Sequence, residues 1–157
     1  MNAAPHRQVS VVRLVGATPE QLYRLVTDLP RMGEWSPENE GGKWLKGATT
    51  AAVGATFKGK NRKGWQRWST LATVVSADQD RLFAFDVTSA GLKVARWSYA
   101  LRPVEGGTEI TESWEDQRSP LIGKITGVLL RVPDRGAHNR AGMEQTLERL
   151  SVAATTG

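Results

Sequence analysis

Glu112 is the residue whose type and position best fit catalysis. It stands between Ile110 and Trp114, and the alternation of a β-strand would turn all three side chains to one face. If that face is buried, the carboxyl group lies in apolar surroundings, which raise its pKa and suit it to general acid or base catalysis. Two alternatives remain open: the opposite face is buried, or Glu112 forms a cross-strand ion pair with Arg96 or Arg102.

Further polar groups accompany this carboxyl. Tyr99 and Asp86 are candidates, and we group Tyr99 with Glu112 as the candidate catalytic pair. His138 and Asn139 open the last helical pattern of the chain. A single histidine near a helix start is more often a surface or capping residue than a catalyst. Helical spacing places Asn139 on one surface with Met143 and Thr146.

Aromatic residues are the second group with a functional interpretation. The chain has six tryptophans, and large aromatic residues in a small domain usually belong to the core. The alternative is that several line a pocket for a flat or apolar ligand, because small-molecule sites are commonly aromatic with a few polar groups. The candidate ligand-binding residues are Trp35, Trp68, Phe83, Phe85, Trp97, Trp114, Asn139 and Met143.

The sequence has few residues or motifs that would support other kinds of chemistry. It has no nucleophile elbow and no phosphate-binding glycine loop. There is no cysteine, and the two histidines lie far apart, so we expect neither thiolate chemistry nor a metal site. No cofactor is expected. Any reaction would therefore be acid–base chemistry in a shaped pocket.

The elements that must position these residues are mostly strands. Residues 8–15 form a β-branched strand, and Thr18-Pro19-Glu20-Gln21 then starts a helix with Thr18 as N-cap of a capping box. A second short helix is predicted at 30–35. Sequential strands joined by short turns, such as the one at Gly106-Gly107, indicate an antiparallel sheet. The further predicted strands are 41–46, 55–62, 65–76, 81–88, 92–103 and 108–117.

The chain closes with its longest helical pattern, at 134–153. Met143, Leu147 and Leu150 recur at steps of three and four residues, which gives one apolar stripe. Asp134 is placed to be the N-cap. A terminal amphipathic helix needs an apolar surface to cover, so we expect a sheet that wraps around this helix. The order of strands and helices indicates the α+β class.

Length and charge limit the remaining possibilities. At 157 residues the chain is most simply one domain, 1–157, and its start has no apolar stretch typical of a secretory signal, so a cytoplasmic location is expected. No apolar run is long enough for stable membrane insertion. The net charge of +5 is uneven, because residues 41–77 contain seven cations and no acid. They could form a solvated edge hairpin protected by lysines, or attract an anionic surface or partner. No recognised nucleic-acid motif accompanies them, so no nucleic-acid partner is expected.

Three stretches of the sequence carry a family resemblance: ATPEQLYRLVTDLPRMGEW, WSYALRPVEGGTEITESWE and HNRAGMEQTLERL. Together they are similar to the START-like or SRPBCC superfamily, and in particular to its polyketide cyclase/dehydrase branch. The resemblance implies a helix-grip (START/Bet v 1-like) fold. Such a fold has a curved antiparallel sheet of about six or seven strands around a long C-terminal helix, with two short helices and a cavity between sheet and helix. The segment 120–132 is then expected near the cavity mouth, as an apolar lid.

The function expected from this resemblance is binding of a small hydrophobic ligand in that cavity. The ligand would be a lipid or an aromatic, polyketide-like metabolite, and the protein a monomer or homodimer. The alternative is a polyketide cyclase/dehydratase that uses acid–base chemistry in the same cavity. A third possibility follows from the basic residues of 41–77, a module that binds a partner protein or an anionic surface.

Overall fold

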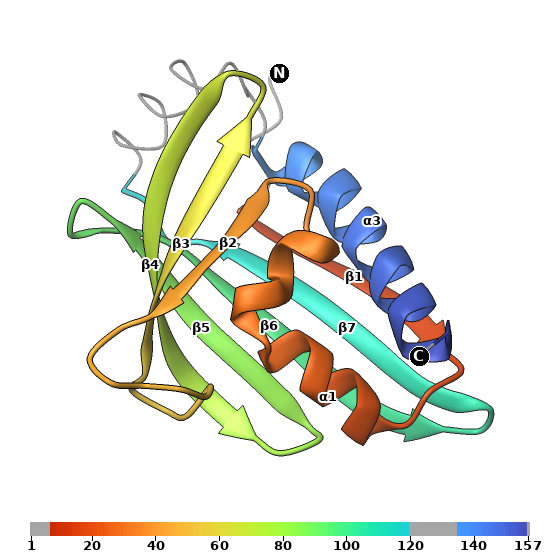
Figure 1. Cartoon of the computed structure of the whole chain (residues 1–157). Coiled ribbons are helices and arrows are strands. Elements are labelled where there is room, and N and C mark those ends of the chain that lie inside the picture. Colours follow the sequence, from red (N-terminus) through yellow and green to blue (C-terminus); the bar gives the residue numbers. More distant parts are fainter. Residues whose placement is uncertain (1–6, 120–134, 157) are drawn as a thin grey trace.

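The computed structural model describes residues 7–119 and 135–156, and its central feature is one curved antiparallel sheet (Figure 1). Seven strands follow the order β1-β7-β6-β5-β4-β3-β2. They are β1 (Gln8–Val15), β2 (Asn39–Trp44), β3 (Thr56–Lys63), β4 (Gln66–Asp78), β5 (Leu82–Ser89), β6 (Leu92–Val104) and β7 (Gly107–Asp116).

Three helices complete the described fold. They are α1 (Pro19–Thr27), the 3-10 helix η1 (Leu29–Glu34) and α3 (Arg135–Thr156). α1 packs against β5, β6 and α3, while η1 packs against β2. α3 lies against β1 and β7. The α+β helix-grip fold is therefore confirmed. The predicted N-cap Asp134 and the predicted lid at 120–132 lie outside the described residues.

The first helix begins where the sequence predicts. The Thr18 hydroxyl oxygen accepts a hydrogen bond from the Gln21 backbone N–H at 3.1 Å. The Gln21 side chain accepts one from the Thr18 N–H at 2.9 Å, which completes the capping box. The helix that follows buries Leu22 and Val26 against the sheet.

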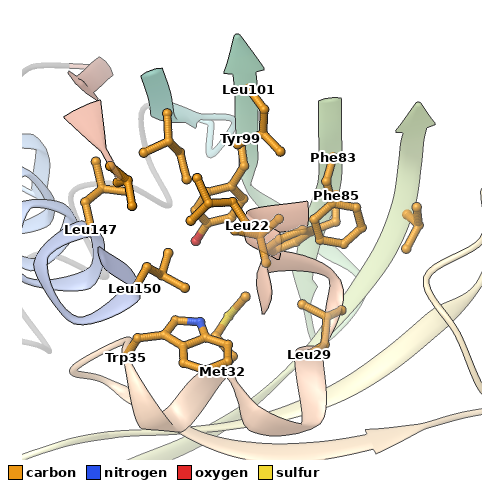
Figure 2. Close-up of a cluster of buried hydrophobic side chains, with 14 of the residues drawn as sticks. Leu22, Leu29, Met32, Trp35, Phe83, Phe85, Tyr99, Leu101, Leu147 and Leu150 are labelled. Atoms are coloured by element: carbon orange, nitrogen blue, oxygen red, sulfur yellow. The ribbon is translucent and has the colours of Figure 1, made fainter. Parts of the chain in front are cut away.

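The main core lies between these helices and the sheet (Figure 2). From the sheet, Phe83, Tyr99 and Leu101 enter it, and all are nearly inaccessible to solvent. Leu147 and Leu150 of α3 enter from the opposite side. The C-terminal half of α3 is thus held by close packing, and the start of the helix is left to face another part of the sheet.

Gly107 lets the first strand close against β7. A Cβ atom at this position would lie 2.0 Å from the Val15 carbonyl oxygen, and φ is +149°. Its neighbour Gly106 also has a positive φ, of +88°, but a Cβ there would meet nothing within 4 Å. A side chain at position 106 would therefore introduce backbone strain alone. A side chain at position 107 would introduce backbone strain and also a clash with β1.

Gly107→Ala is expected to destabilise the protein by about 3 kcal/mol or more, because β1 must move away from β7. Gly106→Ala, the matched control, should cost only about 1 kcal/mol. Urea unfolding of the two variants measures both values. Equal losses would contradict the close approach of the two strands.

Candidate functional site

A cavity of about 470 Å³ lies between the concave face of the sheet and the first half of α3. Its volume falls within the range of sites for small organic molecules. Aromatic and aliphatic side chains from β3 to β7 make up most of its wall. The polar atoms that face it are few, so the position of each can determine how a ligand is oriented.

Three aromatic side chains form a row across the sheet. Phe85 on β5 is the direct cross-strand partner of Trp97 on β6, and Trp97 is the partner of Trp114 on β7. All three line the cavity, as does Trp68 on β4. Directly opposed residues in antiparallel strands point to the same face, which is why the three rings of the row share this wall.

The next row of the sheet brings Tyr99 and Glu112 together. The two residues are direct partners between β6 and β7, and the Tyr99 hydroxyl donates a hydrogen bond to Glu112 Oε1 at 3.0 Å. Both are 2 % exposed and both line the cavity. Glu112 Oε2 is buried and has no hydrogen-bond partner among the described residues. This oxygen is therefore available to a bound molecule.

The alternative ion pairs proposed for Glu112 are not formed. Arg96 instead makes two hydrogen bonds to Asp86, at 2.6 and 2.9 Å. Arg102 pairs with Glu109 in the same manner. These pairs belong to the solvent side of the sheet, so Asp86 does not face the cavity. Glu112 is left on the inner face without a cation from the neighbouring strand.

Burial determines the protonation state of this pair. Loss of hydration raises the pKa of Glu112 to about 8, although the hydrogen bond from Tyr99 acts to lower it. Burial, and then the nearby Glu112 charge, raise the pKa of Tyr99 well above its ordinary value. At neutral pH both groups therefore carry their protons. With Oε1 accepting from Tyr99, Oε2 of a neutral Glu112 can act as a hydrogen-bond or proton donor.

The helical wall of the cavity comes from one face of α3. Asn139, Gly142, Met143 and Thr146 all line it, at the spacing that puts residues on one side of a helix. Asn139 is 7 % exposed, and its Nδ2 has no hydrogen-bond acceptor in the part of the chain that the structure describes. The cavity is therefore faced by one unpaired donor from the helix and one unpaired carboxyl oxygen from the sheet.

The mouth of the cavity is bordered by two polar pairs. His138 Nε2 lies 2.6 Å from Glu38 Oε1, which ties the start of α3 to the segment between η1 and β2. Arg118 makes two hydrogen bonds to the Asp116 carboxylate, both at 2.9 Å. Burial acts to raise the pKa of Asp116, but the Arg118 bonds outweigh it and the pKa is lowered. These pairs satisfy the charged side chains of the rim within the protein.

Two residues predicted to bind ligand do not line the cavity. Phe83 is completely buried, because α1 packs over this part of β5 and β6. Trp35, at the end of η1, is buried in the main core near Leu150 (Figure 2). The Arg31 guanidinium lies 5.5 Å from its ring centre. The structure places both rings in the core, outside the wall of this cavity.

Sequence reasoning also missed polar residues of the wall. Asn61 on β3 donates a hydrogen bond to the Thr70 hydroxyl on β4 at 3.1 Å, and both side chains line the cavity. The signal was present in β3, where Lys58, Lys60 and Arg62 alternate with uncharged residues. Three cations with this period must face solvent, so Asn61 must face inward.

Glu112→Gln is expected to alter the pH dependence of stability. In the folded wild type, Glu112 stays protonated up to about pH 8. In the unfolded chain its carboxyl group has the ordinary pKa of 4.5 and releases the proton near that pH. The contribution of Glu112 to the free energy of unfolding is therefore greatest below about pH 4.5. It falls by about 1.4 kcal/mol per pH unit between pH 4.5 and 8.

The glutamine variant lacks this loss and keeps a hydrogen-bond acceptor for Tyr99. Its stability should match the wild type near pH 4.5 and exceed it by a few kcal/mol at pH 7. Thermal unfolding across this range measures the difference. Glu109→Gln, on the solvent side of the same strand, is the control and should show no such divergence. Parallel pH profiles for wild type and Glu112→Gln would refute a raised pKa.

The described residues offer neither a metal cluster nor a membrane-spanning helix. Among those residues, no three histidine, aspartate or glutamate side chains gather into a potential metal site. None of the described helices has the length and apolar character needed to cross a membrane.

Comparison with known structures shows the same architecture in other proteins. The solution structure of the Polyketide_cyc-like protein Cgl2372 from Corynebacterium glutamicum is 29 % identical, with a TM-score of 0.65 over 96 % of this chain and 91 % of that one. Ara h 8.0201 is 12 % identical, with a TM-score of 0.70 over 98 % and 100 % of the two chains.

The di-domain ARO/CYC StfQ from the steffimycin biosynthetic pathway is similar over half of its length. Its TM-score is 0.73, with 12 % identity and 94 % of this chain covered. No curated protein matches the sequence. The family model described as "Polyketide cyclase / dehydrase and lipid transport" matches residues 6–154. The chain therefore belongs to this family, the polyketide cyclase branch of the SRPBCC superfamily.

Proposed function

We propose that this protein binds a small, flat hydrophobic molecule in the cavity between the sheet and α3. The observation that carries the proposal is the cavity of about 470 Å³ with a wall of Trp68, Phe85, Trp97 and Trp114. Aromatic walls offer a large apolar contact area and favourable ring geometry to planar ligands. An aromatic, polyketide-like metabolite has this character, and a lipid shares its apolar surface.

The two unpaired polar atoms narrow the class of ligand further. Asn139 Nδ2 and neutral Glu112 Oε2 are both donors at pH 7, and they come from opposite walls of the cavity. A buried donor without an acceptor costs about 1–3 kcal/mol. A ligand with carbonyl or hydroxyl oxygens on an apolar ring system would satisfy both donors. A pure hydrocarbon chain would leave them unpaired, so we favour an oxygenated ligand.

Trp97→Ala is expected to weaken ligand binding by about 2 kcal/mol or more, because it removes the middle ring of the aromatic row. Trp44→Ala is the matched control, since Trp44 is also partly buried but packs edge-on against Phe57 and does not line the cavity. Native mass spectrometry of the protein purified from its own host would identify a co-purified molecule.

Titration with 8-anilinonaphthalene-1-sulfonate, a flat apolar fluorophore, then compares the two variants. Trp97→Ala should weaken binding of this fluorophore while Trp44→Ala leaves it near the wild-type value. Similar affinities for all three proteins, with comparable thermal stabilities, would argue against the cavity as the binding site.

Polyketide cyclisation and dehydration is the second candidate, favoured by the neutral Glu112 facing the cavity. In an aldol cyclisation an enol carbon attacks a ketone carbon, and the ketone oxygen must gain a proton as the new bond forms. Glu112 Oε2 would donate that proton and regain one from the enol hydroxyl, which becomes a carbonyl group as the new carbon–carbon bond forms. The Tyr99 hydrogen bond would stabilise the carboxylate formed in between. The cavity would also hold the chain in one folded conformation.

Glu112→Gln separates the two candidates. Glutamine can still donate a hydrogen bond from its amide group but cannot transfer a proton. A carrier should retain its ligand within a few-fold, whereas a cyclase should lose at least 100-fold in kcat. The assay would follow ring closure of a poly-β-keto thioester by absorbance. Unchanged turnover in this variant would exclude Glu112 as the catalytic acid.

A further inference from the structure

The β3–β4 hairpin extends past the rest of the sheet and carries a tryptophan at its tip. Trp65 follows the turn at Gly64, and 88 % of it is exposed. β4 pairs with β5 only from Leu71 onward, and β3 pairs with β2 only up to Asn61. The tip is therefore a two-stranded ribbon. Figure 1 shows it at the end of the molecule where α3 begins.

Cations cover the outward side of the same hairpin. Lys58, Lys60 and Arg62 alternate along β3 and are exposed. Arg67 on β4 is the direct cross-strand partner of Arg62, and Lys43 on β2 is the partner of Lys58. Like charges directly opposite each other destabilise a sheet. Arg62 also lies 3.9 Å from Glu40, but this contact is exposed and weak.

Protection of a sheet edge does not explain the two lysines of this surface. Lysines on an edge strand prevent association with another sheet. The edge here is β2, whereas Lys58 and Lys60 lie on β3, which pairs with a strand on each side. The seven cations of residues 41–77, which include this surface, exceed the chain's net charge of +5, so the remainder of the chain is net acidic. Positive charge is concentrated on one surface beside an exposed indole ring.

We propose that this hairpin surface, defined as Lys58, Lys60, Arg62, Trp65 and Arg67, docks on membranes that contain anionic lipids. Anionic headgroups attract each lysine or arginine near the bilayer surface. Tryptophan favours the headgroup region, where its apolar ring is buried and its N–H stays hydrated. Docking of this kind is peripheral and needs no spanning helix. It would also relieve the repulsion between the opposed cations.

A nucleic acid fits this surface less well. Single strands are bound by stacking successive bases on several aromatic rings along a groove. Trp65 is the exposed ring of the described hairpin, while Trp68 faces the cavity and Trp44 packs on Phe57. The cations also lie on a projecting ribbon. A bilayer needs only charge and one interfacial anchor, which this surface supplies.

The hairpin lies close to the cavity, so docking would affect how a ligand reaches it. A groove lined by Arg62, Gly64 and Gln145 shares His138 and Gly142 with the cavity. The turn end of the hairpin therefore borders a groove that is continuous with the cavity. Docking would bring that groove close to the lipid surface, where an apolar ligand partitions. The docking itself does not depend on which molecule the cavity holds.

Vesicle cosedimentation of the full chain tests the proposal. Vesicles of phosphatidylcholine mixed with phosphatidylglycerol should bind the protein at low salt, and vesicles of phosphatidylcholine alone should bind it at least tenfold more weakly. Salt at about 0.5 M should release it. Combined Lys58→Gln and Lys60→Gln substitutions should lower the partition coefficient about tenfold or more. Trp65→Ala should lower it several-fold. Bromine-labelled lipids should quench fluorescence in the wild type but much less in Trp65→Ala.

Matched controls lie on other surfaces. Arg149→Gln removes an exposed cation from α3, and Leu14→Ala removes a side chain that is 60 % exposed on β1. Both should bind vesicles like the wild type, and circular dichroism should show that all variants fold. Equal binding to neutral and anionic vesicles would overturn the proposal, as would equal losses in the control variants. Salt-sensitive binding to DNA or RNA that is tighter than binding to vesicles would overturn it in favour of a nucleic-acid partner.

Discussion

The packing of α3 against the sheet is the constraint on which the rest of the structure depends. α3 covers the part of the sheet formed by β1 and β7, while α1 packs over β5 and β6, and the packing of α3 differs along its length. Leu147 and Leu150 in its second half are fully buried in the main core. Asn139 and Gly142 in its first half face a cavity instead. Met143 in the same half packs with Val9, Ala95 and Trp114, so this part of the helix is held against the sheet beside the cavity.

The same packing places the buried carboxyl group of Glu112 between the Tyr99 hydroxyl, which donates a hydrogen bond to it, and the open cavity. Its pKa of about 8 shows that the site favours the neutral acid. A neutral carboxyl still needs hydrogen bonds, and Tyr99 satisfies only one of its oxygens. An apolar residue at this position would be easier to bury. Retaining an acid next to an aromatic cavity is consistent with a role in recognising or transforming the contents of that cavity.

The sequence predicted the strands and the inward faces of the sheet but not the division of those faces into core and cavity. Strand alternation correctly grouped Glu112 with Trp114, and the capping box correctly placed the start of α1. Alternation could not separate Phe83 from Phe85, which lie on the same strand and face. Only the position of α1 decides that the first ring is covered and the second borders open space. The burial of Trp35 likewise depends on residues distant in sequence, Leu150 among them, which alternation does not predict.

Alternate residues of strand β3 form two different surfaces of the protein. Phe57 and Asn61 face the cavity, while Lys58 and Lys60 face outward. A slip of one residue would bury the cations and expose the cavity wall, so the register is strongly specified. Gly59 lies between the two inward residues and a Cβ there would meet the Thr70 hydroxyl at 3.3 Å. The same strand therefore fixes the shape of the cavity on one side and the charge of the outer surface on the other. A change in the register of β3 would therefore alter both surfaces together.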